Sequence, residues 1–225
     1  MTTKATAAAR QQSEIGTTHD VRGGDPTDPN RRTAILRAAL EVFARDGFDG
    51  ASMPKIARAA EVGHPLIHYY FGSKDNLWRE AVEHAFGGLK SDVATLDTIG
   101  RDLSPLDRLR LLVRTFTLFA ARNPSHFALI LSEARANTER LRWLQTNFLF
   151  DFVGRLRAVL TEAQAAKQIK SIPVDHLDLI IMGSALLYFT ANFALPDDVD
   201  PDTLATKHAD YVLDTILNGI VLPHK

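Results

Sequence analysis

Hydrophobic residues recur at helical spacing from about residue 29 to the end of the chain, and no stretch alternates in the manner of a half-buried strand. The first apolar face begins after Asp28 and Pro29, which suit an N-cap and a first helical turn, and it stops at Gly47. Its members are Ile35, Leu36, Ala39, Leu40 and Phe43. This spacing predicts a helix that begins at Pro29 and ends near Gly47.

Two short helices are expected next. Ser52 suits the N-cap of a helix of about eight residues that carries Ile56, Ala57 and Ala60. Residues 61–63 form a tight turn, residues 64–70 form the second short helix, and Ser73 caps a longer helix that runs through Ala85. These are the proportions of a helix-turn-helix, although the lengths alone also fit an ordinary three-helix surface hairpin.

Downstream of residue 100 the pattern stays helical, and Asx or Ser before Pro marks several helix starts. We expect helices over residues 104–122, 124–136, 138–167, 173–195 and 200–219. The fold class is therefore all-α, with about nine helices and no sheet. Residues 1–28 have almost no large apolar side chain and are expected to form a flexible N-terminal arm. Residues 29–75 and 76–225 are expected to form the two domains.

The amino-acid composition excludes several classes of function. The chain has no cysteine, which excludes disulfides, zinc–cysteine sites, iron–sulfur clusters and thiol catalysis. Its longest apolar stretch, residues 179–195, is interrupted by polar residues, whereas a membrane span needs about 20 predominantly apolar residues. The N-terminus lacks the apolar core of a secretory signal, so a cytoplasmic protein without membrane partners is expected.

The net charge of −1 conceals an uneven distribution, because residues 31–79 carry an excess of three positive charges. Within that segment, Tyr69, Tyr70 and Phe71 are followed by Ser73 and Lys74. Hydroxyl and ammonium groups at the end of a short helix could hold phosphate oxygens. This combination favours a DNA-binding helix-turn-helix over a plain surface hairpin.

The sequence SMPKIARAAEVGHPLIHYYFGSKDNL, residues 52–77, resembles the DNA-binding signature of TetR-type (TetR/AcrR) transcriptional regulators. The residues in register are Ser52, Ile56, Ala57, Ala60, Val62, Phe71, Ser73, Lys74 and Leu77. The chain departs from the usual pattern at Glu61, where glycine is usual, and at Gly63, Pro65, Leu66 and His68. The resemblance implies that residues 64–70 form the recognition helix and that residues 76–225 form an effector-binding and dimerisation domain.

Contacts to double-stranded DNA are expected from both short helices and the turn that follows them. The candidates are Ser52, Lys55, His64, Pro65, His68, Tyr69, Tyr70 and Lys74. His64 and His68 stand four residues apart, a spacing that could chelate a metal together with Glu61. Because the resemblance places both histidines on the DNA-facing side, contact with bases or phosphates is the preferred interpretation, and no metal or cofactor is expected.

In the second half of the chain, polar residues lie where burial is costly. Ser184, Tyr188 and Asn192 form one line on an apolar helix, and Asp151 interrupts an aromatic run. Such groups could line a small-molecule pocket, make internal hydrogen bonds or sit at a subunit seam. The pocket candidates are Phe116, Phe119, Phe127, Trp143, Phe148, Asp151, Tyr188 and Asn192.

These features together predict a DNA-binding transcriptional regulator and not an enzyme. The expected mechanism is repression at a palindromic operator by a homodimer formed through the last two helices, with release by a small-molecule effector. The alternatives are an effector-independent helical DNA-binding or architectural module, and a helical-bundle hydrolase using Asp151 or His126. No glycine-rich phosphate loop, GxSxG elbow or HExxH motif supports catalysis.

Overall fold

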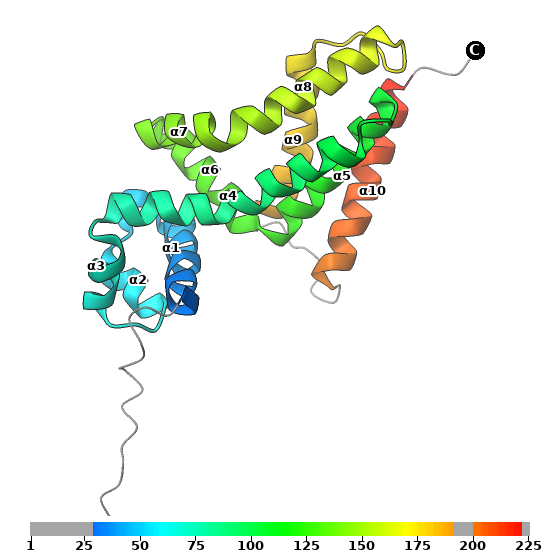
Figure 1. Cartoon of the computed structure of the whole chain (residues 1–225). Coiled ribbons are helices and arrows are strands. Elements are labelled where there is room, and N and C mark those ends of the chain that lie inside the picture. The colour runs from blue at the N-terminus through cyan, green and yellow to red at the C-terminus, as the bar shows by residue number, and fades with distance from the viewer. Residues whose placement is uncertain (1–28, 191–199, 222–225) are drawn as a thin grey trace, which may run out of the picture.

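The computed structural model describes residues 29–190 and 200–221, and within these ranges the chain is helical apart from turns and one isolated β-bridge between Ile169 and Val221 (Figure 1). The α-helices are α1 (Pro29–Gly50), α2 (Met53–Ala59), α3 (His64–Phe71), α4 (Lys74–Ile99), α5 (Pro105–Arg122), α6 (Pro124–Ala136), α7 (Glu139–Leu144), α8 (Phe150–Ala165), α9 (Val174–Thr190) and α10 (Pro201–Ile220). A π-helical turn, η1 (Gln145–Leu149), joins α7 to α8 without a break, so the described chain has nine continuous helical segments. The all-α prediction is confirmed; the expected arm and Asn192 lie outside the described residues.

The predicted helix signals act as expected in the N-terminal unit. The Ser52 hydroxyl accepts a hydrogen bond from the Lys55 amide at 3.4 Å, and the Ser73 hydroxyl accepts one from the Asn76 amide at 3.1 Å. Gly47 interrupts α1 with φ +70° and ψ 171°, a conformation that a residue with a Cβ rarely adopts. The last three residues of α1 therefore point in a new direction and lead into α2.

Two apolar cores hold the chain together, and α4 belongs to both of them. The first half of α4, through Phe86, packs with α1, α2 and α3. The second half, from Leu89 onward, packs with α5, α8, α9 and α10. Figure 1 shows α4 running from the helix-turn-helix unit into the C-terminal bundle. The boundary expected at residue 75 therefore falls at the start of a helix that is common to both units.

The changeover between the cores falls at Gly87 and Gly88, which are exposed and lie inside α4. Glycine weakens a helix by about 1 kcal/mol per residue relative to alanine. A Cβ at either position would meet nothing within 4 Å, so no close contact requires glycine here. The weakest part of α4 thus coincides with the point where it leaves one core and enters the other.

The single long helix expected over residues 138–167 is instead divided by the π-helical turn. The Phe150 amide donates to the carbonyl of Gln145, five residues earlier, so one extra residue is accommodated in this turn. Beyond it, α8 returns to regular geometry with Phe152, Leu156 and Val159 in the core. The apolar spacing of the sequence could not reveal this turn because apolar residues continue on both sides of it.

Glu61 occupies the left-handed region, with φ +55°, in the turn between α2 and α3. A non-glycine residue in this region costs about 1–2 kcal/mol, whereas glycine loses about 0.5–1 kcal/mol more backbone entropy on folding. We therefore expect Glu61→Gly to raise the free energy of unfolding by about 0.5–1 kcal/mol in urea denaturation. Glu61→Ala is the control and should gain nothing, because alanine retains the strain; an equal gain would contradict this explanation.

Candidate DNA interface and effector pocket

The recognition helix α3 has a buried face and an exposed face. Ile67 and Phe71 are buried against α1 and α4, and half-buried Leu66 and Tyr70 pack at the edge of this core. The exposed face carries four of the residues predicted to contact DNA: His64, Pro65, His68 and Tyr69. Tyr69 leaves 69% of its surface exposed. Among the described residues, the side chains of this face are exposed to solvent.

The two histidines of α3 contact each other, with ring centroids 4.7 Å apart in an edge-to-face arrangement. The Nδ1 atom of His68 lies 3.2 Å from the Gly72 carbonyl oxygen. Because a carbonyl oxygen only accepts, Nδ1 carries the proton in this contact. In the neutral ring Nε2 is then an acceptor directed outward, which suits the amino group of adenine or cytosine in the major groove.

Ser52 and Lys55 have intramolecular partners beside the proposed DNA surface. The Ser52 hydroxyl caps α2, and the Lys55 ammonium donates to the Gly50 carbonyl at 2.9 Å and to the Asp46 carboxylate at 3.5 Å. These groups are on or near the surface, and the Lys55 side chain is 47% exposed. Their contact with phosphate therefore stays a prediction, and for Lys55 it requires a change of partner.

Lys74 is placed differently from the exposed phosphate contact that the sequence suggested. Its ammonium donates to the Phe48 carbonyl at 2.9 Å and to the Ala51 carbonyl at 3.1 Å, and it lies 4.3 Å from the centre of the Phe48 ring. The residue is half-buried. Lys74 therefore ties the start of α4 to the bend between α1 and α2, and positions the helix-turn-helix from inside.

The predicted effector residues are not all brought together. Phe116 and Phe127 are fully buried and contact each other in the C-terminal core, where Phe116 also stacks on Phe152. Phe119 is half-buried and packs edge-on against Phe127 and His126. These three phenylalanines line none of the described cavities because they fill the space between α5, α6 and α8.

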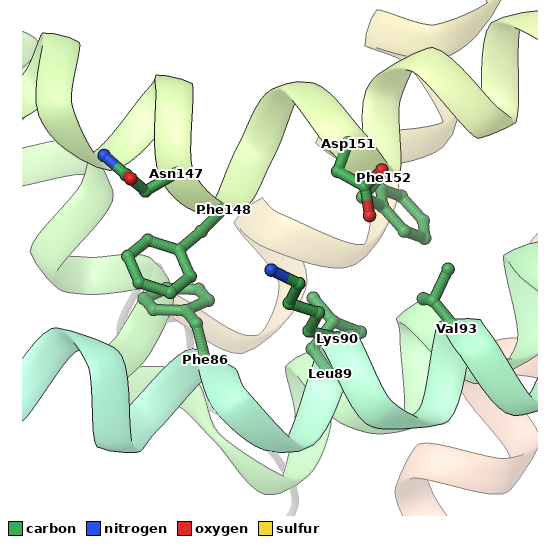
Figure 2. A pocket seen from close by; sticks show the side chains of 8 residues that line it. All are labelled: Phe86, Leu89, Lys90, Val93, Asn147, Phe148, Asp151 and Phe152. Carbon is green, nitrogen blue, oxygen red and sulfur yellow. The ribbon is translucent and has the colours of Figure 1, made fainter.

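Phe148 and Asp151 do line a cavity, and they share it with residues of α4 (Figure 2). The lining residues are Phe86, Leu89, Lys90, Val93, Asn147, Phe148, Asp151 and Phe152. The free space is only about 10 Å³, room for about one water, because the rings of Phe86 and Phe148 lie 5.7 Å apart and fill it. Lys90 points from α4 into the gap between Phe148 and Asp151 in Figure 2.

Trp143 lies next to this cavity and leads back to the DNA-binding unit. Its ring packs 5.5 Å from Phe148 on one side and 5.6 Å from Trp78 of α4 on the other. Trp78 is 1% exposed and belongs to the helix-turn-helix core. Trp143 thus connects the cavity to the helix-turn-helix core, and its expected place in an effector pocket stays a prediction.

Ser184 and Tyr188, the two described members of the polar line on α9, make contacts within α9 and with α10. The Ser184 hydroxyl donates to the Ile181 carbonyl, and the Ser184 carbonyl meets Nε2 of His208 at 3.2 Å. The ring of Tyr188 stacks on His208 at 3.7 Å and 11°. Partial burial lowers the pKa of His208, which favours the neutral ring in this stack. The Ser184 hydroxyl thus has an internal hydrogen bond, and the pocket and subunit-seam interpretations of this line stay predictions.

Comparison with known proteins agrees with this arrangement. Residues 35–81 match the family described as bacterial regulatory proteins, tetR family, and residues 102–216 match the tetracyclin repressor-like C-terminal domain. The chain belongs to the tetR family. It is therefore a DNA-binding transcriptional regulator, and this family is not a class of enzymes.

Individual members resemble the chain over most of its length. The HTH-type transcriptional repressor NicS of Pseudomonas putida is 29% identical over 84% of this chain and 92% of its own. The ketosteroid transcriptional regulator KstR2 of Mycobacterium tuberculosis superposes with a TM-score of 0.73 at 17% identity, covering 88% of this chain and 98% of that chain. AibR in complex with isovaleryl coenzyme A and operator DNA superposes with a TM-score of 0.67 at 20% identity, covering 82% and 97%.

Three features of the described residues bear on the membrane, metal and hydrolase interpretations. None of the helices in residues 29–190 and 200–221 is long and apolar enough to cross a membrane. In the same ranges, no group of three or more histidine and carboxylate side chains is arranged to hold a metal ion. His126, the proposed hydrolase residue, is largely buried, which lowers its pKa to about 4, and its ring packs against Phe86 and Phe119.

We expect Lys74→Met to act mainly on stability. Loss of two hydrogen bonds from a charged, half-buried donor should lower the free energy of unfolding by about 1–3 kcal/mol. The salt dependence of DNA binding should stay unchanged, because loss of a phosphate contact would reduce the slope by about one ion. Lys55→Met is the comparison for the salt dependence, because this 47% exposed lysine is still predicted to contact phosphate and its loss should reduce the slope by about one ion. A reduced slope with unchanged stability for Lys74→Met would instead support the predicted phosphate contact.

Proposed function

We propose that the protein is a repressor that binds a palindromic operator as a homodimer and is released by a small-molecule effector. The observation that carries the proposal is the exposed face of α3, where His64, Pro65, His68 and Tyr69 project from a well-packed helix-turn-helix. Repression is supported by the similarity to NicS, whose name describes a repressor. Release by an effector is supported by the likeness to AibR, which was crystallised with both an acyl coenzyme A and operator DNA.

A homodimer through the last two helices is supported by the apolar surface of α9. Leu179, Ile180 and Leu187 are 69%, 54% and 57% exposed, and Gly183 lies between them on the same side of the helix. Tyr211 of α10 adds a further aromatic ring that is 67% exposed. A continuous apolar stripe of this kind marks a protein–protein interface. A two-fold pair formed there presents two α3 helices to two half-sites of a palindrome.

Release requires that the effector change the separation of the two recognition helices. The groove between α4 and α8 is the proposed effector site, because its Phe148 contacts Trp143 and, through it, Trp78 of the helix-turn-helix core. A ligand that parts Phe86 from Phe148 moves α8 relative to α4. The glycine pair in α4 is the place where this movement meets least resistance. The ligand shifts the equilibrium by the difference of its affinities for the two arrangements.

We expect His64→Gln and His68→Gln to change which operator sequence is preferred. A side chain that contacts a base edge contributes about 1–3 kcal/mol of discrimination at that base pair. Selection of duplexes from a randomised palindrome, by wild type and by each variant, measures the preference. His176→Gln, the same change at an exposed histidine of α9, should leave the selected sequence unaltered. Identical selected sequences for all four proteins would exclude base contacts by these histidines.

We expect Leu179→Glu combined with Leu187→Glu to produce monomers, because two carboxylates would have to be buried in the proposed interface. Sedimentation velocity measures the oligomeric state, and operator binding should weaken by more than tenfold as the two half-sites lose their linked partner. Phe150→Glu is the control, since this residue of α8 is equally exposed, at 57%, but lies outside α9 and α10. A double variant that stays dimeric would place the interface elsewhere.

A further inference from the structure

A larger cavity lies further along the groove between α4 and α8, beside the turn that joins α4 to α5. Its free volume is about 290 Å³, against about 10 Å³ for the cavity around Phe148. Its walls combine Leu96, Leu112 and Val159 with three arginines, Arg101, Arg108 and Arg155. None of the described residues that line this cavity is acidic. Positive groups over an apolar floor suit a molecule that has an anionic end and an apolar body.

The three arginines are available to a ligand in different degrees. Arg101 is exposed in the turn and makes no ion pair with any residue in the described part of the chain. Arg108 pairs with Glu162 through one of its terminal nitrogens, and its side chain is 30% exposed. A ligand in the cavity would therefore have to share or replace the Glu162 pairing.

Arg155 connects this cavity to the one around Phe148. Its Nε donates to the Asp151 carboxylate at 3.2 Å, one turn earlier in α8, and Asp151 lines the smaller cavity. Asp151 and Glu162 are 52% and 48% exposed, and ion pairs at such exposed sites contribute little to stability. An anion in the larger cavity can therefore compete with Asp151 for Arg155 and with Glu162 for Arg108.

The two cavities follow each other along α4. Val93 lines the first and Leu96 the second, and the helix rises about 15 Å from Phe86 to Leu96 at about 1.5 Å per residue. An apolar chain whose anionic end is held by the arginines can run along this path toward Phe86 and Phe148, the pair of rings that now close the smaller cavity.

We propose that the arginine-lined cavity binds the anionic headgroup of an amphipathic effector whose apolar chain lies in the groove toward Phe86 and Phe148. The headgroup chemistry is that of a carboxylate or a phosphate monoester, both of which arginine holds through paired N–H groups. Because it names the chemistry of the effector, this inference rests on the proposed function. The binding of the anion itself can be measured without DNA.

The test uses the full-length protein and four eight-carbon probes: octanoate, octyl phosphate, octylamine and octanol. Calorimetric titration should show binding of octanoate or octyl phosphate, and whichever binds more tightly identifies the headgroup. Octylamine and octanol should bind at least tenfold more weakly. Equal binding of all four probes, or of none, overturns the proposal.

Variants separate the arginines from a general charge effect. Arg101→Gln and Arg155→Gln should each weaken binding of the anionic probe by about tenfold. Arg110→Gln, on the outer side of α5, is the matched control and should bind as wild type. Asp151→Asn should tighten binding by about threefold, because it removes the carboxylate that competes for Arg155. Weaker binding by Asp151→Asn, or equal losses in all three arginine variants, overturns the assignment.

Operator release is measured separately, with a duplex recovered by the selection experiment above. Addition of the anionic probe should lower operator affinity in wild type and leave it unchanged in Arg101→Gln at the same probe concentration. If the probe binds but operator affinity stays constant, the assignment of this cavity to the effector is overturned while DNA binding stands. If no duplex is selected, the proposed repressor function fails, and the calorimetry still decides whether the anion site exists.

Discussion

The aromatic packing between α4 and the turn formed by α7 and η1 is the contact on which the rest of the structure depends. Trp78, Trp143, Phe148 and Phe86 follow one another with centroid separations of 5.5–5.7 Å. Trp78 lies in the helix-turn-helix core, and Phe86 and Phe148 close a cavity in the C-terminal unit. The packing of α1 on α6 is the second connection between the two units; it includes Leu129 in the helix-turn-helix core and a hydrogen bond from Ser125 to Glu41.

The aromatic packing leaves one polar group without a partner. The indole nitrogen of Trp78 is buried and has no hydrogen-bond partner among the described residues, which costs about 1–3 kcal/mol. This is the size of a typical coupling free energy between two ligand sites. An arrangement that gave this nitrogen an acceptor would recover that cost.

Much of the fold could be predicted from the sequence because its signals are local. Serine caps, proline at helix starts and the apolar spacing define the helices over residues 29–80 to within a few residues, and the match of residues 52–77 to a known signature identified their use. The π-helical turn was not predictable in the same way, since its extra residue interrupts no apolar pattern. Glu61 is an intermediate case. The sequence showed that glutamate replaces the usual glycine, and the positive φ at this position explains why glycine is usual there.

The candidate site was harder to predict because it depends on contacts between distant segments. Phe116 and Phe127 carry the same aromatic chemistry as Phe148, and only packing decides that the first two fill a core while the third lines a cavity. Lys74 illustrates the same limit for charge, because its partners are carbonyls of Phe48 and Ala51, more than 20 residues earlier.

Nothing in the sequence indicated that the three arginines of the larger cavity would lie together. Arg101, Arg108 and Arg155 come from a turn and two helices, and they meet only because α8 returns across α4 and α5. A family that shares one DNA-binding unit can thus vary its ligand chemistry through residues that leave the apolar spacing of its helices unchanged. The two halves of the chain are therefore constrained differently. Residues 52–77 must keep one local geometry, whereas the residues that line the groove can vary as long as α4 and α8 still pack against each other.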